Sequence, residues 1–142
     1  GQAIDRVGVM LSLNFPAGPE LEKLSKKSNA VFIIRPSMKN ADCSLSGVEN
    51  KCKKMLSENY EKSDIALFCI DSVIAALDGM YKALMPKYGA LPVVFSGGVT
   101  SNKRIKNYFH DKYNAIFAEP AFSADNAAGT AVLSSIMYDR RK

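Results

Sequence analysis

Two glycines and an asparagine stand where an apolar run gives way to a basic segment. Residues 93–95 are Val-Val-Phe, Gly97 and Gly98 follow, and Asn102 precedes the basic segment. This order predicts a buried strand that ends in a tight turn and then a helix N-terminus, where backbone N–H groups can face a nucleotide or another anion. In open α/β sheets, ligands bind beyond the carboxyl ends of strands, which favours a binding role. The alternatives are that the glycines form only a turn and that Asn102 only caps the helix.

Asp125 stands at a similar transition later in the chain, between Phe-Ser-Ala at residues 122–124 and a run of small residues. Its carboxylate is expected either to cap the last helix or to serve at a metal or phosphate site. His110 is the only histidine, which excludes a two-histidine metal site and argues against a Ser-His-Asp triad within the chain. We expect His110 to be solvated. On its own, Asp5 is expected to be an exposed residue of the first helix, paired with a nearby base.

The composition predicts one globular domain, residues 1–142. The chain is 47% hydrophobic, enough for one ordinary core. A net charge of +5 permits binding to nucleic acid or phosphorylated ligands but does not require it. The most apolar stretch, residues 65–84, is interrupted by Asp71, Asp78 and Lys82, and no secretory signal pattern is present. We therefore expect a cytoplasmic protein that does not associate with membranes.

The three cysteines fit a reducing compartment. Cys43, Cys52 and Cys69 are odd in number and have no C-x-x-C spacing, so they do not indicate a disulfide framework. We interpret all three as packing residues. A reactive thiol at Cys52, flanked by Lys51 and Lys53, is the alternative.

Apolar spacing with a helical period predicts helices, and short β-branched or aromatic runs predict strands. The expected helices span residues 2–12, 20–27, 46–58, 64–85, 102–109 and 125–138, and the expected strands span residues 30–34, 42–45, 93–95 and 115–118. The first two strands are expected to form a hairpin. The last two strands alternate with helices, which predicts a parallel α/β unit with a crossover helix.

Helix termini carry their own signals. Ser46, followed by Glu49 three residues later, has the spacing of a capping box. Ser63 is expected to cap the helix at residues 64–85, whose dense apolar residues predict the central, most buried helix. Pro19 suits the first turn of the helix at residues 20–27.

Five segments occur together in the order and approximate spacing of one family. They are residues 1–6, 15–20, 44–47, 96–102 and 124–128. The chain thereby resembles the C-terminal part of the tRNA threonylcarbamoyladenosine transferases, the glycoprotease family also called O-sialoglycoprotein endopeptidases. The resemblance implies an α/β, RNase H-like lobe of the actin-like ATPase and sugar kinase superfamily, with a sheet flanked by helices. Residues 1–142 would be the second lobe of a two-lobe nucleotide-binding protein, and the first lobe would lie outside the chain.

The resemblance also implies roles for particular residues. Asp5, Gly18 and Asn102 match positions that contact the nucleotide or threonylcarbamoyl-adenylate, and the turn at Gly97 and Gly98 would help to position it. Asp125 matches a ligand of an iron or zinc ion that is also held by two histidines of an H-x-x-x-H motif in the first lobe. Without those histidines, the chain alone is expected to hold neither metal nor nucleotide tightly.

The sequence departs from the family pattern at three positions, which suggests a diverged paralogue. Gln2 replaces the usual acid after a glycine, Ala17 replaces the first glycine of a proline-glycine-glycine turn, and Glu49 stands where a basic residue is common.

The leading functional expectation is that the parent protein is a transferase that moves a threonylcarbamoyl group from an adenylate to a tRNA adenosine. Its expected partners are adenine nucleotide, tRNA and subunits of a tRNA-modification complex, and a homo- or heterodimer is an expected assembly. The chain alone is expected to be inactive. A non-catalytic nucleotide-binding or partner-docking paralogue is the second hypothesis. A metallopeptidase, the historical label of the family, ranks third because the sequence offers no evident nucleophile and base pair.

Overall fold

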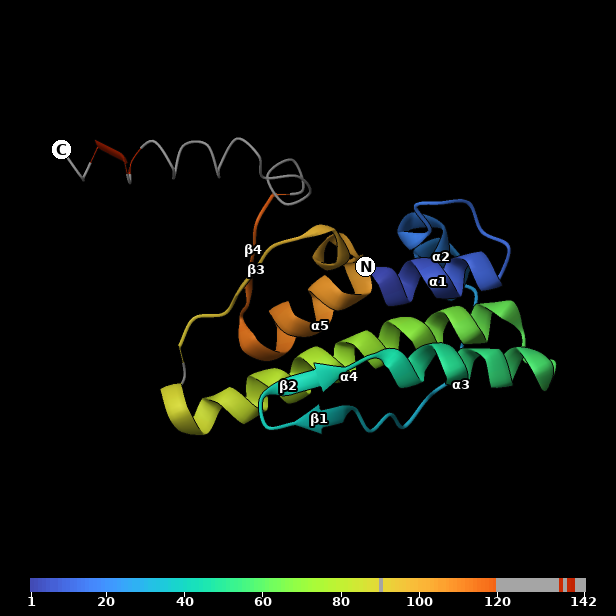
Figure 1. The fold of residues 1–142 in the computed structure, drawn as a ribbon, viewed down its shortest axis with the longest axis horizontal. Helices are drawn as coiled ribbons and strands as arrows, with labels where there is room; N and C mark the ends of the chain where they lie inside the picture. Colours follow the sequence, from blue (N-terminus) through green and yellow to red (C-terminus); the bar gives the residue numbers. More distant parts are fainter. Residues whose placement is uncertain (90, 120–135, 137, 140–142) are drawn as a thin grey trace.

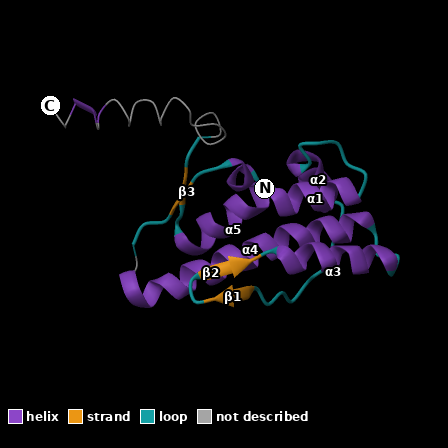
Figure 2. Ribbon diagram, viewed as in Figure 1, coloured by secondary structure: helices purple, strands orange, loops and turns teal. Residues whose placement is uncertain are grey.

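The computed structural model describes residues 1–89, 91–119, 136, 138 and 139. Its helices are α1 (Gln2–Met10), α2 (Gly18–Ser25), α3 (Ser46–Ser57), α4 (Lys62–Tyr88), the short 3-10 helix η1 (Gly98–Ser101) and α5 (Lys103–Tyr113). Its strands are β1 (Ser37–Lys39), β2 (Asp42–Ser44), β3 (Val94–Phe95) and β4 (Ile116–Phe117). The described part of the chain is therefore mostly helical, with two small sheets (Figure 2).

Helix α4 is the longest element, and the other helices pack around it (Figure 1). Its apolar residues are too closely spaced for a single face, so buried side chains surround it, as its composition predicts. The core joins it to α1 through Val7, to α2 through Leu21, to α3 through Cys52 and to α5 through Phe109. These side chains are almost fully buried. The central position of this helix is thus confirmed.

The segment β3–α5–β4 forms the predicted parallel α/β unit. Val94 pairs with Ile116 and Phe95 with Phe117 in a parallel ladder, and α5 connects the two strands. On one face, Phe95 contacts both Phe117 and Phe109 of α5, with ring centroids 5.2 and 4.8 Å apart. On the other face, Val94 and Ile116 are exposed.

The prediction of a strand at residues 30–34 is wrong, although β1 and β2 do form a hairpin. Residues 29–36 have no regular secondary structure, and β1 begins at Ser37, opposite Ser44 of β2. The tight turn is possible because Asn40 adopts a positive φ of 56°, a conformation that asparagine tolerates. Instead of joining a ladder, the apolar residues 32 and 34 pack toward α4, so tertiary contact has overridden strand propensity.

Two predicted helix caps are also wrong. The N-cap positions of α3 and α4 are Leu45 and Glu61, and neither side chain makes a capping hydrogen bond. The Ser46 hydroxyl instead lies 3.0 Å from that of Ser44. Glu49 forms ion pairs with Arg6 and Lys53, at 3.3 and 2.8 Å, and these pairs replace the reciprocal bond of a capping box. The start of the helix predicted at residues 125–138 lies outside the described residues.

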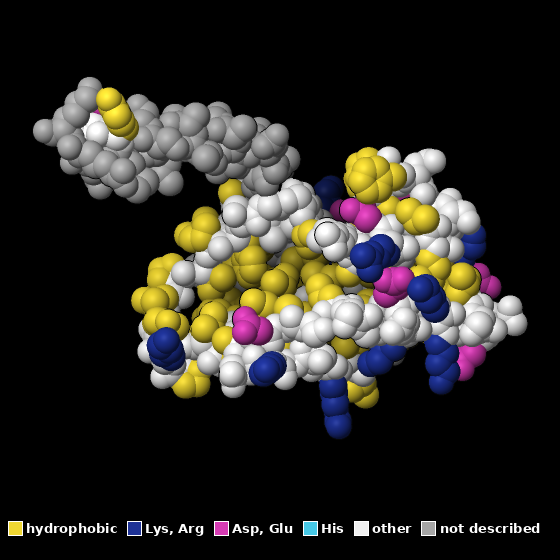
Figure 3. All heavy atoms as spheres, in the orientation of Figure 1, with side chains coloured by type: hydrophobic (Ala, Val, Ile, Leu, Met, Phe, Trp, Pro, Cys, Tyr) yellow, Lys and Arg dark blue, Asp and Glu magenta, His cyan; other side chains and the backbone are white. Residues whose placement is uncertain are grey.

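On the face shown in Figure 3, apolar side chains gather in a hollow between α5 and α4. Large apolar residues are also exposed around the end of α4 and the second sheet: Leu84, Tyr88, Leu91, Val94 and Ile116. Within the described ranges, no helix combines the length and apolarity needed to cross a membrane.

Candidate functional site

A cavity of about 200 Å³ lies where the starts of α2, η1 and α5 approach one another. It brings together three residues that the sequence singled out, Gly18, Gly98 and Asn102. Its remaining lining residues are Ile4, Pro19, Leu21, Glu22, Ile70, Val99 and Ser101. Apolar side chains from α1, α2 and α4 thus form part of a wall that also carries helix N-termini, a composition typical of small-ligand sites. We call this cavity the N-terminal pocket.

Asn102 is the N-cap of α5, as predicted. Its Oδ1 accepts hydrogen bonds from the backbone N–H groups of Arg104 and Ile105, at 3.0 and 3.2 Å. The side chain is polar and nearly buried, since only 9% of the residue is exposed. Capping uses the acceptor of the carboxamide and leaves its Nδ2 donors, which bond to none of the described residues. The cap therefore holds a donor group at the wall of the pocket.

The two turn glycines differ in what they require. Gly97 has φ 104° and ψ 158°, a conformation that side chains rarely adopt, and its carbonyl accepts bonds from the backbone N–H and the hydroxyl of Thr100. Gly98 has no positive φ, and a Cβ built on it would meet nothing within 4 Å among the described residues. The same is true of Gly18 across the pocket. Gly97 is therefore needed for the shape of the turn. Gly98 and Gly18 instead leave the backbone at their own positions accessible from the pocket.

Asp5 does not line the pocket but braces it. Its Oδ1 accepts a 3.0 Å hydrogen bond from the Ala17 backbone N–H, immediately before Gly18. Ala17 is fully buried against Gly8 of α1, where an added Cβ would clash with the Ala17 Cβ. Asp5 is half-buried, so the alternative of an exposed residue paired with a base is wrong. A direct contact between Asp5 and a nucleotide remains a prediction.

Sequence reasoning missed Glu22 and Ser101, which also line the pocket. Glu22 lies four residues after Gly18, one helical turn along the same face of α2, and that spacing was the available signal. Its carboxylate forms a 3.0 Å ion pair with Lys26 and is largely buried, with 15% of the side chain exposed. Glu22 therefore offers a hydrogen-bond acceptor at the pocket, opposite in character to the Asn102 donors.

A charged cluster fixes α5 against α4 and thereby the pocket wall. Asp78 Oδ1 accepts hydrogen bonds from Tyr113 at 2.6 Å, Lys112 at 2.9 Å and Tyr108 at 3.1 Å, and Lys82 lies 2.6 Å from Oδ2. Burial raises the pKa of Asp78, but these donors outweigh it and hold the pKa well below its usual range. Burial and the bond to Asp78 raise the pKa of Tyr113 to about 12.

No group of three or more His, Cys, Asp or Glu side chains that would hold a metal exists among the residues that the structure describes. Asp125 lies outside them, so its predicted metal role rests on the sequence. His110 is exposed and lies 3.3 Å from Asp111, which confirms the prediction of a solvated histidine.

The cysteines behave as packing residues. Cys52 and Cys69 are buried and face each other between α3 and α4, and Cys43 is half-buried. A hydrogen bond from Cys69 lowers the pKa of Cys52, whereas the same contact and burial raise the pKa of Cys69. Because Cys52 is inaccessible, its flanking lysines do not make it a reactive surface thiol.

Comparison with known proteins places the chain. Residues 1–132 match the family described as "TsaD: tRNA N6-adenosine threonylcarbamoyltransferase". Curated proteins of that name are similar along nearly the whole chain: that of Buchnera aphidicola subsp. Schizaphis graminum is 33% identical over 97% of the chain, and that of Kosmotoga olearia is 29% identical over 100%. A third, from Brachyspira hyodysenteriae, is 30% identical over 99%. In each case the match covers 45% of the relative's length.

The chain thus spans about half the length of the relatives that it matches. The match runs through α1, α2, η1 and α5, the elements that form the N-terminal pocket. The chain belongs to the TsaD family of tRNA N6-adenosine threonylcarbamoyltransferases.

Proposed function

We propose that the N-terminal pocket is one wall of an adenine-nucleotide or adenylate site in a protein that transfers a threonylcarbamoyl group to a tRNA adenosine. In this proposal residues 1–142 are the second, RNase H-like lobe of a two-lobe protein of the actin-like ATPase superfamily. The parallel β3–α5–β4 unit and family membership support the lobe assignment. The family description supports the proposed activity and tRNA substrate of the parent protein, and its partner subunits are proposed from the resemblance.

One observation carries the proposal: Gly18 and Gly98, 80 positions apart in sequence, line the same pocket. Neither residue adopts a positive φ, and neither is packed so closely by the described chain that a Cβ would clash. The described residues therefore give no internal reason for glycine at these positions. Close approach of a ligand to the backbone is a reason that remains, because only glycine leaves that space empty.

The polar groups of the pocket suit a nucleotide. The N-termini of α2 and α5 carry the positive end of the helix dipole, which favours phosphate. At α5 the Arg104 and Ile105 N–H groups are already bonded to Asn102, so this helix contributes mainly through its dipole. The Nδ2 donors of Asn102 and the carboxylate of Glu22 can hydrogen-bond to a base or a sugar hydroxyl. At about 200 Å³ the pocket is smaller than the roughly 300 Å³ at which ordinary ligand sites begin. We propose that it holds part of the ligand.

In the transfer, the residues of this chain bind and orient the adenylate. Donors fixed before the reaction stabilise charge that develops at the reacting carbonyl and at the departing phosphate. The family's metal, held in part by Asp125, would supply Lewis-acid chemistry. The described residues provide no ligand set for it, so we derive no step through the metal.

The proposal is tested by adding a methyl group to the pocket wall. In the intact protein, Gly98→Ala should leave the melting temperature unchanged or slightly raised, and should weaken AMP binding about tenfold or more in calorimetry, which is about 1.4 kcal/mol. Gly47→Ala is the matched control, because a Cβ at Gly47 of α3 also meets open space. Equal AMP affinity in both variants would contradict the proposed site.

A non-catalytic nucleotide-binding paralogue is the second candidate. It is favoured by Ala17, whose side chain fills the space against Gly8 where the family turn has a glycine. Nucleotide binding by the intact protein without threonylcarbamoyl transfer to tRNA would support this candidate, and transfer would exclude it.

A further inference from the structure

Residues 31–36 cross the surface of α4 as a single extended segment. At one end the Phe32 ring packs edge-on against Phe68, with centroids 5.4 Å apart. At the other end Pro36 lies beside Gly79, where an added Cβ would be 3.2 Å away. Phe68 and Gly79 are 11 positions apart, about 16 Å of helix. Residues 32–36 reach at most about 14 Å even when fully extended, so the segment is extended and its end side chains cover the remaining distance.

The segment has the properties of a strand without a partner. Side chains alternate in burial: Phe32 and Ile34 face α4, whereas Val31 and Ile33 are 91% and 96% exposed. Among the described residues, none forms a backbone hydrogen bond with residues 31–36. Unpaired N–H and C=O groups next to exposed β-branched side chains are the features that let a sheet edge accept another strand.

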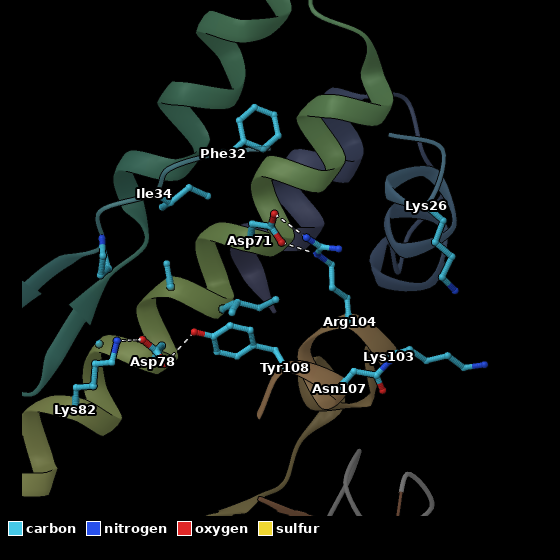
Figure 4. Close-up of a pocket in the computed structure, with 14 residues that line it drawn as sticks. Lys26, Phe32, Ile34, Asp71, Asp78, Lys82, Lys103, Arg104, Asn107 and Tyr108 are labelled. Atoms are coloured by element: carbon cyan, nitrogen blue, oxygen red, sulfur yellow. Dashed lines mark hydrogen bonds and ion pairs between the residues drawn. The ribbon is translucent and has the colours of Figure 1, made fainter. Parts of the chain in front are cut away.

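A groove runs along one side of this segment. It is about 950 Å³ in volume and opens between the inner side chains of the segment, α4 and α5 (Figure 4). Ile74, Ala75 and Gly79 of α4 lie along it, and Arg104 and Tyr108 of α5 form the opposite wall. A strand laid against residues 31–36 on this side would fill the groove and place alternate side chains over α4.

The charge of the groove limits which strand can enter. Its lining contains four cationic side chains, Lys26, Lys82, Lys103 and Arg104, against two carboxylates. Both carboxylates are already paired, Asp71 with Arg104 and Asp78 with Lys82 and Lys112. Lys26 is paired with Glu22, which lies outside the groove lining, and Lys103 extends away from both carboxylates (Figure 4). The groove is therefore positive overall, and a strand with acidic residues gains attraction there.

A second copy of the chain is a poor electrostatic match for the positively charged groove. The same segment from another copy carries Arg35 and no carboxylate, so it would add positive charge to a groove that is already positive, and like charges across an interface are repulsive. We propose that the Phe32–Pro36 edge and its groove dock an extended acidic segment of a partner protein, which adds a β-strand to residues 31–36.

Strand pairing is tested with the intact protein and a fluorescein-labelled nonapeptide in which valine alternates with threonine between terminal glutamates. Fluorescence anisotropy should show saturable binding. Two further peptides carry N-methyl groups, one on the odd-numbered amides and the other on the even-numbered amides. Because one edge of a strand uses alternate N–H groups, one methylated peptide should bind at least about tenfold more weakly and the other about as well as the parent. Equal binding of all three peptides would overturn the proposal.

Charge is tested with a matched pair of variants. Lys103→Glu reverses a charge in the groove, whereas Lys51→Glu reverses one in a separate cavity of about 160 Å³ on the other side of the segment. Lys103→Glu should weaken the peptide by about three- to tenfold at low salt, and Lys51→Glu by less than twofold. Equal losses would overturn the assignment to the groove.

Hydrogen exchange shows whether the groove is already occupied by another part of the protein or by a second copy. In the intact protein without peptide, the amides of residues 31–35 should exchange rapidly, and saturating peptide should slow them. Protection before peptide is added would show that the groove is filled by the same chain or by a second copy, and would overturn the proposal.

Discussion

The carboxylate of Asp5 and the backbone N–H of Ala17 are joined by a 3.0 Å hydrogen bond that ties α1 to the start of α2. The bond spans 12 positions in the sequence and fixes the residue immediately before Gly18. An acid that resembles a ligand contact therefore has a structural role at the edge of the N-terminal pocket.

Replacing this acceptor should disturb the pocket. Asp5→Ala leaves the Ala17 N–H unpaired, and we expect a loss of about 1–2 kcal/mol in unfolding free energy together with weaker AMP binding. Asp5→Asn keeps an oxygen acceptor and should recover most of the stability. Urea denaturation and calorimetry measure the two effects. If Asp5→Asn is stable but still loses AMP affinity, Asp5 contacts the nucleotide directly.

Asn102 should separate capping from binding. Asn102→Asp retains an oxygen acceptor for the N–H groups of Arg104 and Ile105 but removes the Nδ2 donors and adds a negative charge. We expect thermal stability close to that of the wild type and a large loss of AMP affinity. Asn102→Ala should lose both, with about 1 kcal/mol of stability attributable to the cap. Unchanged AMP binding by Asn102→Asp would restrict this residue to capping.

Substitutions at Gly8 and Ala17 should compensate for each other in their effects on stability. Gly8→Ala places a methyl group against the Ala17 Cβ, and such overpacking costs about 1–3 kcal/mol. Ala17→Gly opens the space, so the double variant should recover most of the loss. A double-mutant cycle by urea denaturation measures this coupling. Additive effects would show that α1 and the turn do not touch as closely as the structure indicates.

Asp78 should make stability depend on acid pH. Its pKa is lower in the folded state than the unfolded value of about 3.9. Its stabilising contribution is therefore complete above about pH 4 and is lost as the pH falls toward the folded-state pKa. Asp78→Asn should cost about 1–3 kcal/mol at pH 7 and less at pH 3.

Paired urea titrations at the two pH values test this expectation. Asp111→Asn is the control, because 79% of that side chain is exposed, and it should change stability little at either pH. A loss from Asp78→Asn that is as large at pH 3 as at pH 7 would contradict the role of the charge.

Features that depend on neighbouring residues were predictable. The cap at Asn102 involves residues 102–105 only, and the positive φ of Gly97 follows from a turn between a strand and a helix. The length and central position of α4 follow from its continuous apolar spacing. Sequence patterns predicted these features because the interactions that create them involve residues only a few positions apart.

Features that depend on distant partners were not predictable. Residues 30–34 have strand propensity, but Phe32 and Ile34 pack against α4 and form no ladder with another described strand. The four donors to Asp78 include three on α5, at least 30 positions away. Glu22 lines the pocket because the face of α2 that carries Gly18 and Glu22 is directed toward η1. Such contacts are set by how helices pack, and one sequence does not encode their geometry in a local pattern.

The sequence by itself determined the local chemistry: a glycine turn, a helix cap, an acid in α1 and membership of a family whose motifs occur in order. Only the tertiary structure decided that Gly18 and Gly98 share one pocket, that Asp5 braces it, and that residues 31–36 lie beside a positive groove without a backbone hydrogen bond to any other described residue. The physical reason is that propensity and capping act over a few residues, whereas the packing of α2 and α5 around α4 brings together groups as distant in sequence as Gly18 and Gly98, which are 80 positions apart.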